Sequence, residues 1–392
     1  MSERLHRVYL IPGMFGFGRL AGYAYFGHLD AAITGRYAAA GIPVIVEVVP
    51  TPPTASIRRR ARVLSQAIAR SAGEDDGPIH LIGHSTGGLD ARLLVSPSAA
   101  MDLAGTRAWT SRVASIVTLS TPHYGSPLAA FFATVSGTRL LYAISLLTVT
   151  SLSVGSPPLA AFSSLVAAVG SMDEAFGADI QLLDRTTDLI LRFIGDRGRE
   201  DVYGYLEGIR HDQGGIIQIM PEAMDLFNAA VENATSVRYG CVVAAAPKPG
   251  PVRFVTSIRS PYAAASAALY STLYTIAARA SERYPYATLD PSTQGLLEAA
   301  LDEPLDESVT DGIVPTQSML WGDVLWAGKA DHLDVVGHFR DDEKPETHVD
   351  WLASGAGFNR QRFRAMCDAI VRMMLAGEAP PEIAAGGGPP LT

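Results

Sequence analysis

Residues 79–88 read IHLIGHSTGG, in which a short apolar run leads into a serine that lies between glycines. A run of this kind is typical of a buried strand, and the apolar residues of 89–95 are typical of a helix that follows it. Ser85 therefore lies where a strand turns sharply into a helix. The question is whether this serine is a nucleophile.

Such a crowded turn requires small residues two positions before and after the serine, and Gly83 and Gly87 meet this requirement. The turn would lift the hydroxyl clear of the sheet and direct the amide of Thr86 toward the same space. The alternative is a serine that caps a glycine-rich phosphate loop, but no lysine follows and the spacing fits no nucleotide-binding motif. With 29 serines and 37 glycines, chance supplies about 0.26 matches to the pattern, so the surrounding sequence must decide.

Strands alternate with helices around this turn. Strands are expected at 7–13, 42–50, 78–84, 113–122, 236–247 and 323–328, and helices at 26–41, 55–73, 89–95 and 358–377. In the helix at 55–73 the apolar residues share one face and the arginines crowd the other. Strands joined through helices form parallel units, so the sequence predicts an α/β fold with a mostly parallel central sheet flanked by helices.

From about residue 127 to 230 the alternation stops, and apolar sequence of helical character takes its place. The predicted parts are a sheet domain at 1–127 and 232–380, an inserted helical cap (lid) at 128–231, a candidate second cap at 250–305 and a disordered tail at 381–392. No formal charge occurs from Leu140 to Met172, yet GSPP at 155–158 divides this run. Two short cap helices are therefore favoured over a membrane span.

The composition limits the partners and the compartment. A net charge of −9 and a pI near 5.5 leave no basic surface for nucleic acid. Cys241 and Cys367 cannot build a disulfide framework and are expected to be buried free thiols. No signal peptide precedes the first strand, so we expect a cytoplasmic protein, or a secreted one if a leader has been removed.

A serine hydroxyl becomes an effective nucleophile only when a base takes its proton and donors hold the oxyanion. LIPGMFGFG at 10–18 follows the first strand, and its glycines let the backbone bend and present the amide of Met14. Alone, this segment would be an ordinary Gly/Pro turn. Together with Ser85 it predicts an oxyanion hole formed by the amides of Met14 and Thr86.

The acid is expected in SVTDGIVPTQSM at 308–319, where Asp311 lies in a turn before an apolar run. Asp302 and Asp306 are rivals, within a charged stretch that is typical of a solvated face. The order nucleophile, acid, histidine then requires a histidine beyond the acid.

Three histidines meet this requirement. His332 follows the strand at 323–328 by four residues and is the predicted base, with His338 in reserve. His348 lies in a charged segment that is typical of a solvated loop. His84 and His123 precede the acid, and we expect them to line the pocket or support the site.

Six segments, in this order, resemble those of the bacterial triacylglycerol lipases and esterases of the α/β-hydrolase superfamily. They are RVYLIPGMFGFG (7–18), IHLIGHSTGGLDARLL (79–94), VASIVTLSTPHYGSPLA (113–129), IMPEAMDLFNAAV (219–231), DGIVPTQSMLWG (311–322) and DHLDVVGH (331–338). More loosely they resemble the lecithin–cholesterol acyltransferase group, which shares the Pro-Gly form of the first segment. The resemblance implies an α/β-hydrolase fold with Ser85, Asp311 and His332 as a catalytic triad and Met14 and Thr86 as amide donors.

This chain departs from the family at two places. Pro12 stands where the family usually has a histidine, which removes a side chain from beside the oxyanion loop. The family often holds a structural calcium near the histidine loop, and Asp334 matches one ligand position. His338 stands where an amide ligand would be expected, and no second acidic ligand can be placed. Calcium is therefore not predicted, nor is any other metal or cofactor.

The sequence thus predicts a serine carboxylic-ester hydrolase, an esterase or lipase that acts on hydrophobic acyl esters through an acyl-enzyme. Its substrate would be a small-molecule or lipid ester, and the uncharged cap is compatible with transient contact with a lipid interface. A phospholipase or acyltransferase, or a polyester hydrolase, would use the same triad. A non-catalytic lipid-binding module is disfavoured because all three triad residue types occur in order.

Overall fold

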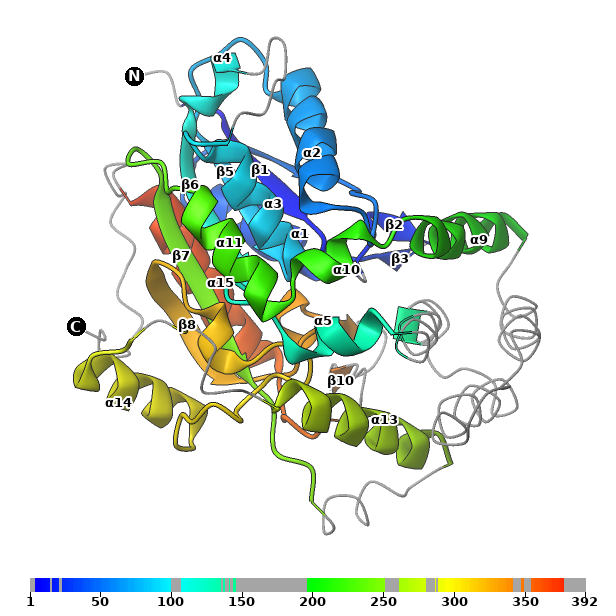
Figure 1. Cartoon of the computed structure of the whole chain (residues 1–392). Helices are drawn as coiled ribbons and strands as arrows, with labels where there is room; N and C mark the ends of the chain where they lie inside the picture. Colours follow the sequence, from blue (N-terminus) through cyan, green and yellow to red (C-terminus); the bar gives the residue numbers. More distant parts are fainter. Residues whose placement is uncertain are drawn as a thin grey trace.

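The computed structural model describes residues 4–14, 16–20, 23–99, 107–134, 137, 141, 144–145, 196–250, 261–279, 286, 288–340, 347–348 and 354–376. A six-stranded sheet forms the centre of this part of the chain (Figure 1), in the order β4-β1-β5-β6-β7-β8. Every neighbouring pair of strands is parallel. The strands are β1 (His6–Ile11), β4 (Val44–Val48), β5 (Ile79–His84), β6 (Val113–Leu119), β7 (Arg238–Ala245) and β8 (Asp323–Lys329).

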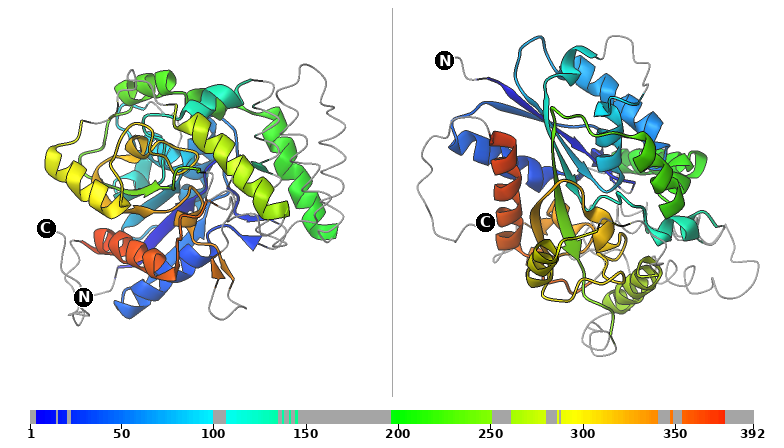
Figure 2. Two further views of the ribbon diagram at one scale, coloured as in Figure 1. Left: turned by 90° about the horizontal axis from the view of Figure 1, so that it is seen from below. Right: turned by 60° about the vertical axis from the view of Figure 1, so that its left-hand side comes forward.

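Helices cover both faces of the sheet, with α2, α3 and α11 on one face and α1 and α15 on the other (Figures 1 and 2). These are α1 (Gly27–Ala39), α2 (Ile57–Ser71), α3 (Thr86–Val95), α11 (Pro221–Ala230) and α15 (Arg360–Leu375). The other described helices are α4 (Arg107–Thr110), α5 (Pro127–Phe132), α9 (Asp196–His211), α10 (Gly214–Gln218), α13 (Pro261–Ala277) and α14 (Pro291–Leu301). The described part also contains two 3₁₀ turns, η2 (Thr316–Met319) and η3 (Asp334–Val336). Two small antiparallel sheets are formed by β2 (Arg19–Leu20) with β3 (Tyr23–Ala24) and by β9 (Phe339–Arg340) with β10 (Thr347–His348).

The three layers follow from the period of two along each strand. In β1, Leu10 belongs to the same buried cluster as Ile33 of α1, whereas Ile11 belongs to a second cluster with Leu64 of α2. The strand is buried along its whole length, because helices cover it on both faces. This is why the central strands read in the sequence as continuous apolar runs.

The strand order fixes where the site lies. From β1 the chain crosses to β4 at the edge of the sheet and then returns to β5, on the other side of β1. In open parallel sheets, ligands bind outside the carboxyl ends of the strands at the point where the order reverses. The segments that leave β1 and β5, namely residues 12–14 and Ser85, meet at this point.

The expected parallel α/β sheet is confirmed, and each expected strand and helix coincides with an element of the structure. Between 127 and 230 the described residues form helices and no strand. Much of the expected cap, residues 146–195, lies outside the described residues, as does the expected tail, so the domain boundaries stay predictions. Within the described part, no helix has the length and apolar character that crossing a bilayer requires. Cys241 and Cys367 are buried and free, as expected.

Candidate active site

Ser85 lies in the sharp turn from β5 to α3, with φ 52° and ψ −129°, a conformation that side-chain-bearing residues rarely adopt. The glycines around it allow this close packing. A Cβ on Gly83 would lie 2.3 Å from the nitrogen of Gly88, and a Cβ on Gly87 would lie 2.3 Å from the carbonyl oxygen of Ile11. The turn thus has the strained geometry that the sequence predicts for a nucleophile.

The loop after β1 passes directly beside this serine. A Cβ on Gly13 would lie 2.4 Å from the Cβ of Ser85 and 3.1 Å from its Oγ. The loop turns back through a 3.1 Å hydrogen bond from the Gly16 amide to the Gly13 carbonyl, and Met14 lies within this turn. Thr86 is the first residue of α3, and amides of a first helical turn have no partner inside the helix. Both predicted donors therefore belong to segments that border Ser85.

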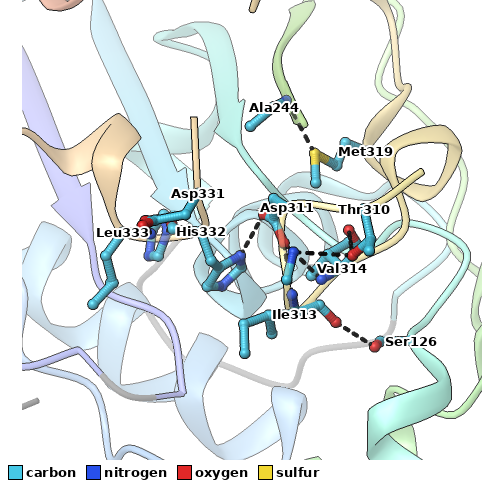
Figure 3. Close-up of polar contacts among 12 residues, drawn as sticks. Ser126, Ala244, Thr310, Asp311, Ile313, Val314, Met319, Asp331, His332 and Leu333 are labelled. Carbon is cyan, nitrogen blue, oxygen red and sulfur yellow. Dashed lines mark hydrogen bonds and ion pairs between the residues drawn. The ribbon is translucent and has the colours of Figure 1, made fainter. Parts of the chain in front are cut away.

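Asp311 and His332 are brought together (Figure 3). The Nδ1 of His332 lies 2.7 Å from Oδ2 of Asp311, and its backbone amide donates to the Asp311 carbonyl at 3.1 Å. The second carboxylate oxygen accepts the amides of Ile313 and Val314 at 2.9 and 2.7 Å. Both partners of the pair are buried, with exposed fractions of 0% for Asp311 and 1% for His332.

This pairing assigns the tautomer of His332. An ionised carboxylate only accepts, so Nδ1 carries the proton and Nε2 of the neutral ring carries the lone pair. Nε2 is buried and has no hydrogen-bond partner in the part of the chain that the structure describes. It is therefore available to accept a proton.

His84, the residue before Ser85, reaches the same loop. Its Nε2 donates to the carbonyl oxygen of His332 at 2.7 Å, and its Nδ1 lies 3.0 Å from the hydroxyl of Tyr25. The reserve base, His338, does not contact Asp311: its Nδ1 lies 2.5 Å from the hydroxyl of Tyr23. Burial lowers the pKa of His338 to about 3.

The other candidates have hydrogen-bond partners other than Asp311 and His332. Asp302 is the C-cap of α14, and Asp306 accepts from the amide and hydroxyl of Ser308 on the surface. His348 pairs with Asp334, with 2.9 Å between Nε2 and Oδ1. His123 contacts Thr118 and Arg92 rather than the acid.

Arg60 is a supporting residue for which the prediction that the arginines of 55–73 lie opposite the apolar face is wrong. Its guanidinium is only 1% exposed. It donates to Asp90 at 2.9 Å, to the carbonyl of Pro52 at 2.7 Å and to the carbonyl of Pro12, at the start of the loop after β1, at 2.6 Å. Its position three residues after the buried Ile57, on the apolar stripe of α2, is the signal that could have revealed it.

The described residues include no cluster of three or more His, Cys, Asp or Glu side chains suited to a metal ion. The carboxylate of Asp334, the matched calcium position, accepts the amide of Asp331 at 2.8 Å and pairs with His348. It therefore stabilises the turn that carries His332.

Residues 54–138 match a family model described as "PGAP1-like alpha/beta domain". The matched range includes α2, β5, the turn at Ser85 and β6. No protein of curated function matches the chain.

The chain is also similar to solved structures. Lipase 1 from Pelosinus fermentans is 15% identical, with a TM-score of 0.49 over 90% of this chain and 98% of that one. EstA from Clostridium botulinum is 15% identical, with a TM-score of 0.48 over 92% and 87%. The metagenomic carboxyl esterase MGS0156 is 18% identical, with a TM-score of 0.46 over 96% and 77%.

Proposed function

From the α/β-hydrolase fold of this chain, we propose that the protein is a serine carboxylic-ester hydrolase that acts on hydrophobic acyl esters. The observation that carries the proposal is the pairing of buried Asp311 with His332. Nε2 of His332 stays unpartnered within the described residues, and the backbone of His332 contacts His84, the residue before Ser85. Fold alone does not define a reaction, so the proposal is supported by this base and by the strained serine turn rather than by the fold.

The reaction is acyl transfer to water in two steps. Nε2 of His332 takes the proton of Ser85 Oγ as the oxygen attacks the ester carbonyl. The amides of Met14 and Thr86 hold the oxyanion, and one such donor contributes about 3 kcal/mol. Asp311 stabilises the imidazolium that forms. His332 then returns the proton to the leaving alcohol, and water cleaves the acyl-enzyme by the same route.

The test is hydrolysis of a chain-length series of p-nitrophenyl esters, run below and above the solubility limit of each ester. Ser85→Ala is expected to abolish turnover and labelling by a fluorophosphonate probe. Ser65→Ala, which removes a buried hydroxyl on α2, is the matched control and should retain both. Full turnover in Ser85→Ala would exclude the serine mechanism.

The same assay addresses the acceptor. If added alcohols divert the acyl group from acid to new ester, the protein is an acyltransferase with the same triad. If soluble acids are released from polymer films, its substrates include polyesters. The chain-length preference measures how deep the acyl pocket is.

A further inference from the structure

His84 is the last residue of β5, directly before Ser85, and each of its two ring nitrogens makes a hydrogen bond. His84 is 1% exposed. On one side its Nε2 meets the carbonyl oxygen of His332 at 2.7 Å, and on the other its Nδ1 meets the phenol of Tyr25 at 3.0 Å. The rings of His84 and His332 lie side by side, with centroids 4.8 Å apart.

These two contacts fix the protonation of His84. A carbonyl oxygen only accepts, so Nε2 must carry the proton, and Nδ1 then accepts from the Tyr25 hydroxyl. Burial lowers the pKa of His84 well below its usual value, so the ring stays neutral with a single proton. A neutral ring satisfies both bonds at once, without a buried charge beside the base.

The backbone of His332 is consequently held on both sides. Its amide donates to the Asp311 carbonyl at 3.1 Å, and its carbonyl accepts from His84. Within the turn itself, Asp331 Oδ1 accepts the amides of Leu333 and Asp334 at 3.0 Å. Those bonds shape the turn, whereas His84 connects the turn to the strand that carries Ser85.

We propose that His84 is a positioning residue that sets His332 relative to Ser85, and that Tyr25 holds its tautomer; this rests on the proposed function. A general base acts only when its nitrogen lies within hydrogen-bond reach of the hydroxyl. The nucleophile and the base belong to segments about 250 residues apart, and His84 is adjacent in sequence to Ser85. A rotation of the His332 backbone would move Nε2 while leaving the rest of the fold intact.

The variants separate this role from simple packing. His84→Leu fills a similar volume without a donor, whereas the amide nitrogen of His84→Gln can replace Nε2. Tyr25→Phe removes only the hydroxyl on Nδ1. Tyr23→Phe is the matched control, because it removes the equivalent hydroxyl from buried His338, which does not bond to His332.

We expect His84→Leu to lower kcat for p-nitrophenyl butyrate by about 10²-fold with KM changed less than twofold, because a misplaced base slows only the chemical step. His84→Gln should recover most of this loss, Tyr25→Phe should fall between them, and Tyr23→Phe should match the parent. The melting temperature is measured for each, and if the leucine variant fails to fold, the glutamine and phenylalanine variants carry the test.

A second readout does not depend on activity. The proton shared by His332 Nδ1 and Asp311 is expected to give a low-field ¹H NMR resonance. It should persist in His84→Gln and shift or broaden in His84→Leu. If the parent protein hydrolyses no ester, the proposed function fails while this spectrum still tests the positioning role. An unchanged kcat and resonance in His84→Leu, or equal losses in the leucine and glutamine variants, would overturn it.

Discussion

The two oxygens of Asp311 do different things. Oδ1 accepts the amides of Ile313 and Val314, and Oδ2 faces Nδ1 of His332. In Asp311→Asn the amide keeps an acceptor for the turn but turns a donor toward Nδ1, which forces the proton of His332 onto Nε2. We expect kcat to fall by about 10⁴-fold with little change in KM. Ester hydrolysis and the melting temperature check this, and a loss below tenfold would contradict the assigned role.

A substitution at Gly13 tests whether the loop after β1 lies against Ser85, as the proposed oxyanion hole requires. A Cβ there would lie 2.4 Å from the Cβ of Ser85, so Gly13→Ala must displace either the loop or the serine. We expect most of kcat to be lost while the protein still folds. Gly35→Ala on α1 is the control, because an added Cβ meets nothing within 4 Å. If both variants hydrolyse esters equally well, the loop does not lie against the serine in solution.

A site residue could be predicted from the sequence when its sequence neighbours reveal its role, and not when its role depends on contacts between distant segments. Ser85, Asp311 and His332 each follow a strand or lie in a turn, in the chain order that is typical of α/β-hydrolases. The connection of His84 to Tyr25 spans 59 residues, and that to His332 spans 248. Such contacts depend on the arrangement of the sheet, so the sequence indicates only that His84 is near the site.

At the scale of elements, Arg60 connects α2 to the loop after β1. Its guanidinium bonds partners in three segments: Asp90 on α3, the carbonyls of Pro52 and Pro53 on the loop after β4, and the carbonyl of Pro12. Arg60→Lys keeps the charge but cannot reach all three, because an ammonium is a point donor. Loss of about two charge-assisted bonds should lower the free energy of unfolding by about 3 kcal/mol and also lower kcat.

Urea unfolding and ester hydrolysis check this prediction. Arg59→Lys is a suitable control, because Arg59 lies next to Arg60 on the same helix but is largely exposed. Equal free energies of unfolding for the two lysine variants would show that the hydrogen bonds of the Arg60 guanidinium contribute little to stability.

Elements buried on both faces and helices with an apolar stripe could be predicted, whereas helix α14 could not. The central strands read as apolar runs because helices cover both sides of the sheet. Helix α14 buries only Leu297 and Leu301 and has no apolar stripe to reveal it. Its start was nevertheless readable, because Asp290 caps the helix through the amides of Ser292 and Thr293, and Pro291 occupies the first helical position.

At the scale of the whole molecule, alternating strands and helices predict a parallel sheet but not the order of its strands. That β1 lies between β4 and β5 depends on which apolar faces fit together, and many pairs of such runs are equivalent in the sequence. The meeting of residues 12–14 with Ser85 follows from this order. The sequence predicts this meeting from the chemistry of the two motifs and not from the order of the strands.

Four of the buried histidines in the described part of the chain have pKa values that burial lowers. Desolvation lowers the pKa values of His80 and His338 to about 3, and those of His84 and His123 fall well below the usual 6.5. When the pH falls through about 6.5, these groups take up protons in the unfolded chain and not in the folded one. Their stabilising effect is therefore full above this pH and is lost as the pH falls. The pKa of Asp90, raised to about 6 by burial, acts in the opposite direction.

Together, these pKa shifts predict that the free energy of unfolding decreases in mild acid. Between pH 7.5 and 5.5 each histidine should cost about 1.4 kcal/mol, or about 5.5 kcal/mol together, and Asp90 should offset about 1 kcal/mol. Urea unfolding at both pH values measures the difference. His80→Gln, on the buried face of β5, should reduce the difference by about a quarter, whereas His211→Gln on the exposed surface of α9 should leave it unchanged. A free energy of unfolding that stays constant over this range would mean that these histidines do not remain neutral in the folded protein.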